Sequence, residues 1–369
     1  MKTKLNFRKL ITNLLIVLLV LTASFELNAQ ETVFHGKING IDDTKISIIV
    51  ISLNEKKAAV FDTISCVKGE FSYRPKLDLD KWYLVRLNSN TFDNMLGYEK
   101  SCLHRLKNRE IVFFIQAYDN LSIVANIEQY GINYQVTGNQ IASQSNAFKH
   151  KIYPLEKKYN QFIISDQLEE LSSIRGKIHK VQLEMIAQHP DWLYSAMLLP
   201  NFPIDTISKY FNNFTPQVRE SFFGKYASEF LIAPTGSQAP TFTLRNNKRR
   251  CVSLDDFAGQ YIVLNFWGSW CEHCACDLPK MKEYHNKYKD QISFLSIDCR
   301  DSKKDWKNAL SKYKINFINL YDKDNKIAKK YGVHRYPTKV IIDKEGNIIS
   351  KTIGETADFY NKLDELFNK

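Results

Sequence analysis

Two cysteines separated by two residues, Cys271 and Cys274, have the spacing of a pair that switches between two thiols and one disulfide. They follow an apolar run, residues 261–266, which predicts a strand, and they open a segment with helical spacing. A cysteine pair in this strand–turn–helix context is typical of thiol–disulfide exchange. The sequence therefore predicts a redox-active disulfide at the start of a helix.

The first cysteine of the pair is the expected nucleophile. Only a thiolate attacks a disulfide, and the pKa of an unperturbed cysteine is about 8.5. A helix N-terminus stabilises negative charge by roughly 0.3–1 kcal/mol, or up to about 2 kcal/mol when partly buried, which lowers a pKa by about one unit. Glu272 and His273 are expected to tune this pKa further, because a protonated His273 supplies a nearby cation. We predict Cys271 as the exposed nucleophile and Cys274 as the buried resolving thiol.

Two other interpretations of the pair are a zinc half-site and a static disulfide. Cysteines at this spacing also bind zinc, but a closed site needs a second pair, and the sequence has none at similar spacing. His273 and Cys276 complete a site only if the segment is not helical. We therefore favour exchange and expect no metal and no cofactor, with copper or zinc handling as an alternative.

Residues 241–369 supply the elements that position the pair. Predicted strands and helices alternate there, which indicates an α/β domain whose sheet carries crossover helices on its faces. The expected strands are 261–266, 292–298, 316–321, 339–343 and 348–353, and the expected helices are 271–289, 303–313, 325–331 and 356–367. Trp270, directly before the pair, is expected to shield the sulfur atoms.

Residues 233–369 resemble the thioredoxin-like domain of the TlpA/ResA-type bacterial periplasmic thiol–disulfide oxidoreductases. The motifs that carry the resemblance are Ala239-Pro240-Thr241-Phe242, Leu254-Asp255-Asp256-Phe257-Ala258-Gly259, Asn265-Phe266-Trp267, Trp270-Cys271-x-x-Cys274, Pro279 and Tyr336-Pro337-Thr338. The resemblance implies a central mixed sheet with flanking helices. It also implies that Pro337 is a cis-proline facing the disulfide, with Tyr336 and Thr338 beside the substrate groove.

An acidic residue three positions after the second cysteine is also similar to the ResA-type pattern, and here it is Asp277. Residues i and i+3 share a helix face, so Asp277 can lie under Cys274 and take its proton. Many thioredoxins carry a buried aspartate where this chain has Asn265, which cannot do so. The alternative for Asp277 is a surface ion pair with Lys280.

The direction of electron flow is open at this stage. The TlpA/ResA-type scaffold resembles reductants, whereas a dipeptide ending in His273 resembles oxidising members of the superfamily. We expect a reductant of protein disulfides, with a disulfide oxidase or isomerase as the alternative. The resemblance implies protein thiol or disulfide substrates, apocytochrome c among them, and a membrane thiol–disulfide electron donor.

The rest of the chain predicts export and two further regions. Residues 1–29 have the basic start, apolar run and small-residue cleavage site of a signal peptide, which predicts the periplasm or cell envelope, with membrane association if it is not cleaved. Residues 30–137 predict a small antiparallel β-sandwich, and residues 138–232 a helical connector. Both resemble the segments that precede the redox domain in secreted members. Residues 233–240 predict a linker, and residues 233–369 the redox domain.

The net charge and the remaining cysteines limit which other partners and functions the sequence allows. The net charge of +11 is spread over mixed faces, and with an export signal we expect no nucleic-acid partner. A protein that docks partners through residues 31–232, with an incidental redox domain, is a competing class. Seven cysteines leave at least one thiol unpaired. Cys66 and Cys102 form one possible disulfide, and Cys251, Cys276 and Cys299 are expected mainly as small core residues, with a Cys251–Cys299 pair possible.

Overall fold

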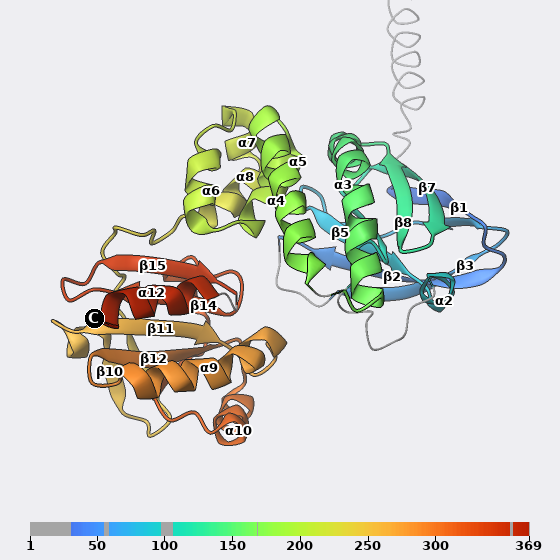
Figure 1. The fold of residues 1–369 in the computed structure, drawn as a ribbon. Helices are drawn as coiled ribbons and strands as arrows, with labels where there is room; N and C mark the ends of the chain where they lie inside the picture. Colours follow the sequence, from blue (N-terminus) through green and yellow to red (C-terminus); the bar gives the residue numbers. More distant parts are fainter. Residues whose placement is uncertain (1–30, 55–58, 97–105, 168, 355–356, 369) are drawn as a thin grey trace, which may run out of the picture. The chain divides into compact units, whose positions relative to one another are not determined.

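A computed structural model describes residues 31–54, 59–96, 106–167, 169–354 and 357–368 (Figure 1). The chain divides into two compact units, residues 1–185 and 186–369. The expected signal peptide lies outside the described residues. Across the described residues, no helix combines the length and apolar character needed to cross a bilayer.

The first unit is built on two four-stranded sheets, with strand orders β4-β1-β7-β8 and β3-β2-β5-β6. Alternating buried and exposed positions along the strands place apolar side chains of both sheets in one shared core. The sequence predicted antiparallel pairing throughout, but β1 and β7 run parallel. The strands are β1 (Val33–Asn39), β2 (Thr44–Ser52), β3 (Val60–Cys66), β4 (Glu70–Tyr73), β5 (Tyr83–Asn88), β6 (Ile111–Ile115), β7 (Asn120–Glu128) and β8 (Gly131–Thr137).

Helices follow these strands and continue into the second unit. A short helix, α2 (Asn90–Met95), lies between β5 and β6, and the long helix α3 (Gln140–Ile164) begins at an Asn139 cap. The two units divide within the next helix, α4 (Glu170–Gln188). The second unit starts with a group of short helices, which are α5 (Leu193–Leu198), η2 (Leu199–Asn201), α6 (Ile204–Phe211), α7 (Pro216–Glu220) and α8 (Phe222–Glu229). The four-part division expected from the sequence stays a prediction.

A seven-stranded mixed sheet forms the rest of the second unit, in the order β10-β9-β13-β12-β11-β14-β15. Its three central parallel strands, β11, β12 and β13, follow the strand–helix alternation of the sequence. The strands are β9 (Thr243–Asn246), β10 (Cys251–Ser253), β11 (Tyr261–Trp267), β12 (Ile292–Cys299), β13 (Ile318–Asp322), β14 (Thr338–Ile342) and β15 (Ile348–Ile353). The helices are η3 (Leu254–Phe257), α9 (Glu272–Tyr288), α10 (Lys303–Tyr313), α11 (Lys326–Lys330) and α12 (Ala357–Phe367).

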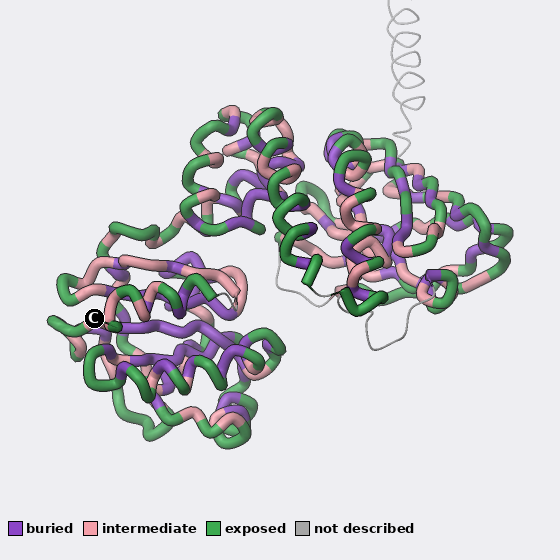
Figure 2. Tube along the Cα trace, viewed as in Figure 1, coloured by how far each residue is buried: buried purple, intermediate pink, exposed green. Residues whose placement is uncertain are grey.

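Both faces of this sheet are covered, which makes its central strands the most deeply buried part of the unit (Figure 2). Apolar side chains of α9 and α12 pack on one face, and those of α11 pack on the other. Burial on both faces explains why these strands read as continuous apolar runs rather than alternating patterns. The sequence prediction of an α/β domain with a mixed central sheet is confirmed.

The segment 233–240, expected as a linker, is hydrogen-bonded to the edge of this sheet. Gly236 N donates to Ile348 O at 2.7 Å, and Ile348 N donates to Ser237 O at 2.8 Å. Farther along, Ala239 N donates to Gly346 O at 2.9 Å. The segment is therefore part of the folded domain, and its Pro and Gly residues shape an edge connection instead of a free tether.

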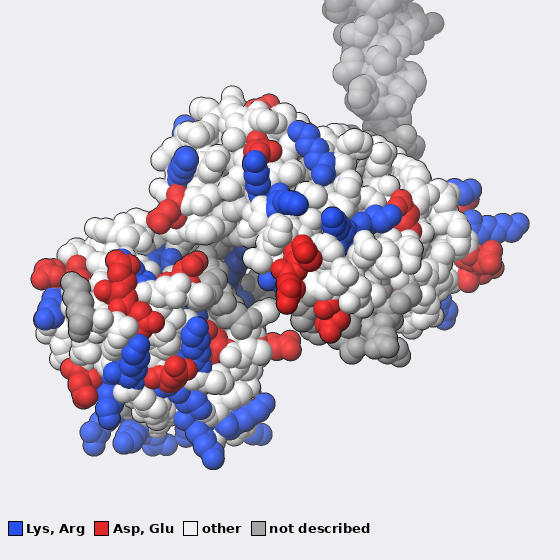
Figure 3. Space-filling model, in the orientation of Figure 1, with Lys and Arg blue, Asp and Glu red and all other residues white. Residues whose placement is uncertain are grey.

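Charged side chains are mixed in sign on the surface. Figure 3 shows Lys and Arg interspersed with Asp and Glu over most of the visible face, with Lys and Arg more frequent along its lower left edge. This mixture agrees with the expectation of solvated, mixed-charge faces. The charges close to the cysteine pair are therefore more informative about function than the overall surface charge.

Candidate functional site

The cysteine pair forms a disulfide at the N-terminus of α9. Cys271 and Cys274 are joined, and Cys271 is the N-cap residue of the helix. The backbone N–H of Cys274 donates to Cys271 Sγ at 3.1 Å. A thiolate released at this sulfur by reduction has a helix amide directed at it, which is the environment that lowers a cysteine pKa.

The structure corrects the expected exposure of Cys271. Cys271 is only 6% exposed and Cys274 only 1% exposed. Both pack in a cluster with Trp267, Leu278 and Trp306. The order is as predicted, since Cys271 is the less buried of the two, but in the disulfide form its sulfur is bonded on one side and covered by apolar side chains on others.

The loop before the disulfide is held from the end of β12. Asp301 accepts hydrogen bonds from Ser269 N at 2.8 Å and from Ser269 Oγ at 2.7 Å. Trp270 Nε1 donates to Cys299 O at 3.0 Å, while the indole remains 48% exposed. The loop is thus pinned at two successive residues, and Trp270 presents an exposed ring beside the sulfur pair.

The expected cis-proline is present. The Tyr336–Pro337 peptide bond is cis, and the Tyr336 ring meets the Trp270 ring edge-on with centroids 5.2 Å apart. The next residue, Thr338, pairs with Phe266 at the end of β11, the strand that leads to Cys271. Sheet register therefore brings two motifs nearly seventy residues apart to the same end of the sheet.

Thr338 was predicted to flank the substrate groove; that role stays a prediction, and the structure shows that its side chain is buried. Its side chain is 1% exposed, and its Oγ1 donates to Arg335 O at 2.7 Å. The residue lies inside the sheet between β11 and β15. Its hydroxyl closes the turn that contains Pro337, so it supports the cis-proline loop from within.

A groove of about 470 Å³ opens beside the disulfide. It brings together five residues that the sequence selected, which are Trp270, Cys271, Glu272, His273 and Tyr336. Three further lining residues were missed, which are Arg300, His334 and Arg335. Arg300 follows β12 and the other two precede the cis-proline, so a search around Pro337 could have found His334 and Arg335.

Asp277 is buried in an ion pair beneath the disulfide helix. It is 6% exposed, and its Oδ2 lies 2.8 Å from Nζ of Lys339, a lysine with no exposed surface. Tyr360 donates to Asp277 Oδ1 at 2.9 Å, and Lys339 Nζ also donates to Gly354 O at 3.1 Å. The surface pair with Lys280 considered from the sequence is wrong. The sequence did not indicate Lys339, because a lysine inside an apolar strand is usually assigned to an exposed position.

The comparisons with known proteins agree with this geometry. Residues 235–351 match the AhpC/TSA family. The thiol-disulfide oxidoreductase ResA of Bacillus thuringiensis subsp. konkukian is 34% identical over 135 residues, which are 36% of this chain and 77% of that protein. ResA of Bacillus subtilis is 32% identical over 124 residues, which are 33% of this chain and 69% of that protein. This chain belongs to the ResA family of thiol-disulfide oxidoreductases.

Solved structures of similar proteins are also known. One is the thioredoxin domain of a thiol-disulfide oxidoreductase from Bacteroides vulgatus, with 29% identity and a TM-score of 0.34 over 36% of this chain and 96% of that one. Another is a thiol:disulfide interchange protein from Bacteroides sp., with 30% identity and a TM-score of 0.34 over 37% of this chain and 91% of that one.

Burial shifts several ionisable groups close to the disulfide of this ResA-family chain. Burial, followed by the neighbouring carboxyl of Asp301, raises the pKa of Asp298 to about 10, so Asp298 is protonated near neutrality. Burial raises the pKa of the Cys299 thiol well above its usual range, and burial likewise raises the pKa of Tyr336. Asp298, Cys299 and Tyr336 are therefore neutral at pH 7 and add no net charge beside the disulfide.

The remaining cysteines of the described chain are free thiols. Cys66 and Cys299 are buried, and Cys251 and Cys276 are exposed. The possible Cys251–Cys299 disulfide is therefore wrong, as is the expectation that Cys251 and Cys276 are core residues. Cys102, the possible partner of Cys66, lies outside the described residues.

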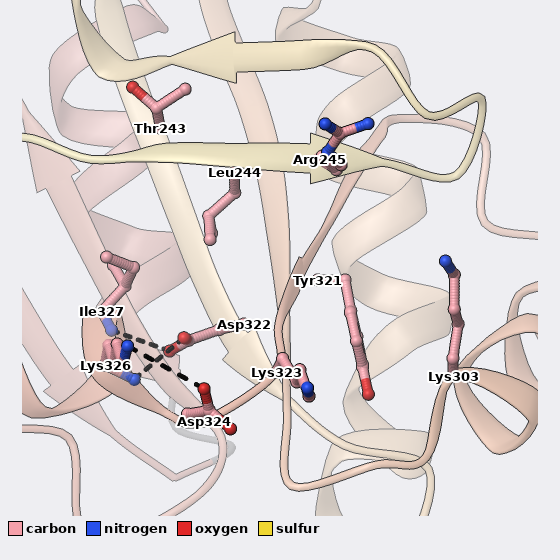
Figure 4. A pocket seen from close by; sticks show the side chains of 10 residues that line it. All are labelled: Thr243, Leu244, Arg245, Lys303, Tyr321, Asp322, Lys323, Asp324, Lys326 and Ile327. Atoms are coloured by element: carbon pink, nitrogen blue, oxygen red, sulfur yellow. Dashed lines mark hydrogen bonds and ion pairs between the residues drawn. The ribbon is translucent and has the colours of Figure 1, made fainter.

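Other candidate sites of the ResA-family domain lie away from sulfur. Across the described residues, no group of three or more His, Cys, Asp or Glu side chains is arranged to hold a metal ion. A pocket of about 570 Å³ lies between β9 and the β13–α11 turn (Figure 4). There Asp322 accepts hydrogen bonds from three backbone amides at the start of α11, those of Lys326, Ile327 and Ala328. The Asp322 carboxylate therefore caps the start of α11 and has a structural role. None of the described residues that line this pocket is a cysteine.

Proposed function

We propose that this ResA-family enzyme reduces disulfides of exported proteins in the cell envelope through Cys271 and Cys274. The observation that carries the proposal is the disulfide at the start of α9, beside the cis Tyr336–Pro337 bond and an open groove. A substrate segment in that groove can reach Cys271 and meet the backbone before Pro337, as extended peptides do when they add to a strand. The reaction needs no bound cofactor.

In the proposed cycle the reduced enzyme acts first through Cys271. Its thiolate attacks one sulfur of the substrate disulfide, so that a mixed disulfide forms and one substrate thiolate leaves. Cys274 then attacks Cys271 Sγ, which forms the intramolecular disulfide and releases the second substrate thiol. Two electrons pass from the enzyme to the substrate, and an external thiol donor must return them.

Asp277 is the proposed acceptor of the Cys274 proton during the second step. It lies three residues after Cys274 on α9, which places both on one helix face. Its ion pair with Lys339 and its hydrogen bond from Tyr360 hold its side chain in place in a buried setting. The proton released from Cys274 can then leave the site through this network once the disulfide has formed.

Trapping tests the exchange chemistry. In Cys274→Ser, Cys271 can still attack but no resolving thiol remains, so mixed disulfides with substrate proteins should accumulate in envelope extracts and disappear on treatment with dithiothreitol. The control is the Cys271→Ser/Cys274→Ser double variant, which should trap nothing. An equal yield of adducts from both variants would show that trapping does not depend on Cys271 and would reject the proposal.

The equilibrium potential tests the proposed direction. A reductant should have a potential close to that of thioredoxin, about −270 mV, whereas oxidising and isomerising members lie near about −120 to −180 mV. The measurement is the oxidised fraction of the full chain in glutathione buffers of known ratio. A value in the higher range would overturn reduction and favour the oxidase or isomerase alternative.

A further inference from the structure

Arg300 has a backbone conformation that its side chain does not favour. It follows β12 with φ = 67°, in the left-handed region that residues other than glycine seldom adopt. Such conformations persist where the surrounding structure enforces them, and they cluster at ligand-binding and active sites. The conformation therefore directs attention to where the Arg300 side chain is placed.

The Arg300 guanidinium is held against the two aromatic rings beside the disulfide. Its Cζ lies 5.5 Å from the centroid of the Trp270 ring and 5.0 Å from the centroid of the Tyr336 ring. Stacking on two rings restricts a flexible side chain while leaving its N–H groups free to bind a ligand. Arg300 lines the same groove as Cys271 and is exposed to solvent.

No carboxylate of the described chain neutralises this guanidinium. None of the ion pairs among the described residues includes Arg300. The adjacent Asp301 directs both carboxylate oxygens to Ser269. Glu272 is the one carboxylate among the described residues that line the groove.

A second guanidinium is fixed in the groove by the preceding helical segment. Arg335 Nη2 donates to Asn201 Oδ1 at 2.6 Å, and its Cζ lies 5.8 Å from the Phe230 ring. The neighbouring His334 Nδ1 is 3.3 Å from Glu229 Oε2. Residues of the helices before the redox domain thus hold the two side chains that lead into the cis-proline loop.

We propose that the groove selects substrates with an aspartate or glutamate beside the reacting cysteine, and that Arg300 is the specificity-determining contact. The inference rests on the proposed exchange function and names its substrate class. A guanidinium presents a planar fork of donors that matches a carboxylate in two parallel hydrogen bonds. Arg335 adds a second positive charge to the same groove, so a carboxylate that enters it meets two cations.

The test compares two disulfide peptides that differ only in charge. One carries Glu on both sides of its reacting cysteine, and the other carries Gln. The measurement is the second-order rate constant for reduction of each peptide by the pre-reduced full chain. For the unmodified enzyme we expect the Glu peptide to react about fivefold faster, which is the size of a partly exposed charge pair. In Arg300→Gln the ratio should fall to about one, and in Arg300→Lys it should be intermediate.

Arg249 provides a matched control. It is also an exposed arginine in the left-handed region, with φ = 64°, but it lies in the β9–β10 turn and does not line the groove. Arg249→Gln removes the same charge from the same kind of backbone position and should leave the ratio unchanged. Equal ratios in the unmodified enzyme and Arg300→Gln, or an equal slowing of both peptides in Arg300→Gln, would overturn the inference. Failure of the unmodified enzyme to reduce either peptide would instead reject the proposed function.

Discussion

Lys339→Met should lower the free energy of unfolding by about 3–5 kcal/mol at pH 7, because it removes one partner of a buried ion pair. Lys339 has no exposed surface and Asp277 is 6% exposed, so water cannot replace the lost cation. Among the described residues, Tyr360 would remain as the hydrogen-bond donor to the Asp277 carboxylate. Urea unfolding of the oxidised full chain measures the change.

Two further variants separate the ion pair from simple packing. Lys339→Met with Asp277→Asn removes both charges and should recover most of the loss, because no buried carboxylate is then left unpaired. Lys280→Met removes an exposed lysine from the same helix as Asp277 and should change stability by less than about 1 kcal/mol. A loss below about 1 kcal/mol in Lys339→Met would contradict the buried pair.

The pH dependence of the free energy of unfolding provides a second test of the same prediction. A buried carboxylate without a cation can be neutralised by a proton, so the deficit of Lys339→Met should shrink as the pH falls from 7 towards 4. The double variant has no carboxylate at this position and should show no such recovery. If the single variant were equally destabilised at both pH values, lost packing of the lysine stem would explain the effect better than lost charge.

Local patterns predicted the central strands and the helices of the redox domain, but not its edge strands β9 and β10. The strands β11 and β12 are buried on both faces, so their apolar runs are continuous, and α10 has the bounds that its periodicity indicated. The first unit was harder. Strand β8 was not predicted, and nothing in a short strand's own residues states that β1 will pair in parallel with β7. Pairing between distant strands depends on the assembled core.

The site divides in the same way between local and long-range information. Cys271, Cys274 and Pro337 belong to short motifs, and their disulfide and cis peptide bond were expected. Arg300 and Lys339 belong to no motif. Register pairs Lys339 with Asn265, one position along from the Thr338–Phe266 pair that aligns the cis-proline with the disulfide loop. A chemical role that depends on register across a sheet cannot be read from spacing along the chain.

Cys271→Ser should abolish exchange, with a loss on the order of a thousandfold or more in the rate of disulfide reduction, because a serine hydroxyl cannot replace the thiolate nucleophile. Cys276 allows a matched control. It is a free, exposed thiol only five residues later on the same helix, so Cys276→Ser removes one cysteine without touching the disulfide. The rate of insulin reduction by the full chain measures both variants.

Alkylation of the reduced chain tests why Cys271 rather than Cys276 reacts. Accessibility alone favours Cys276, which is exposed, over Cys271, which is 6% exposed in the disulfide form. Thiolate character favours Cys271, because its sulfur caps α9 and faces the Cys274 amide. Near pH 6.5 we therefore expect iodoacetamide to modify Cys271 first. Faster labelling of Cys276 would mean that the helix N-terminus does not activate Cys271, and the proposed nucleophile would lose its physical basis.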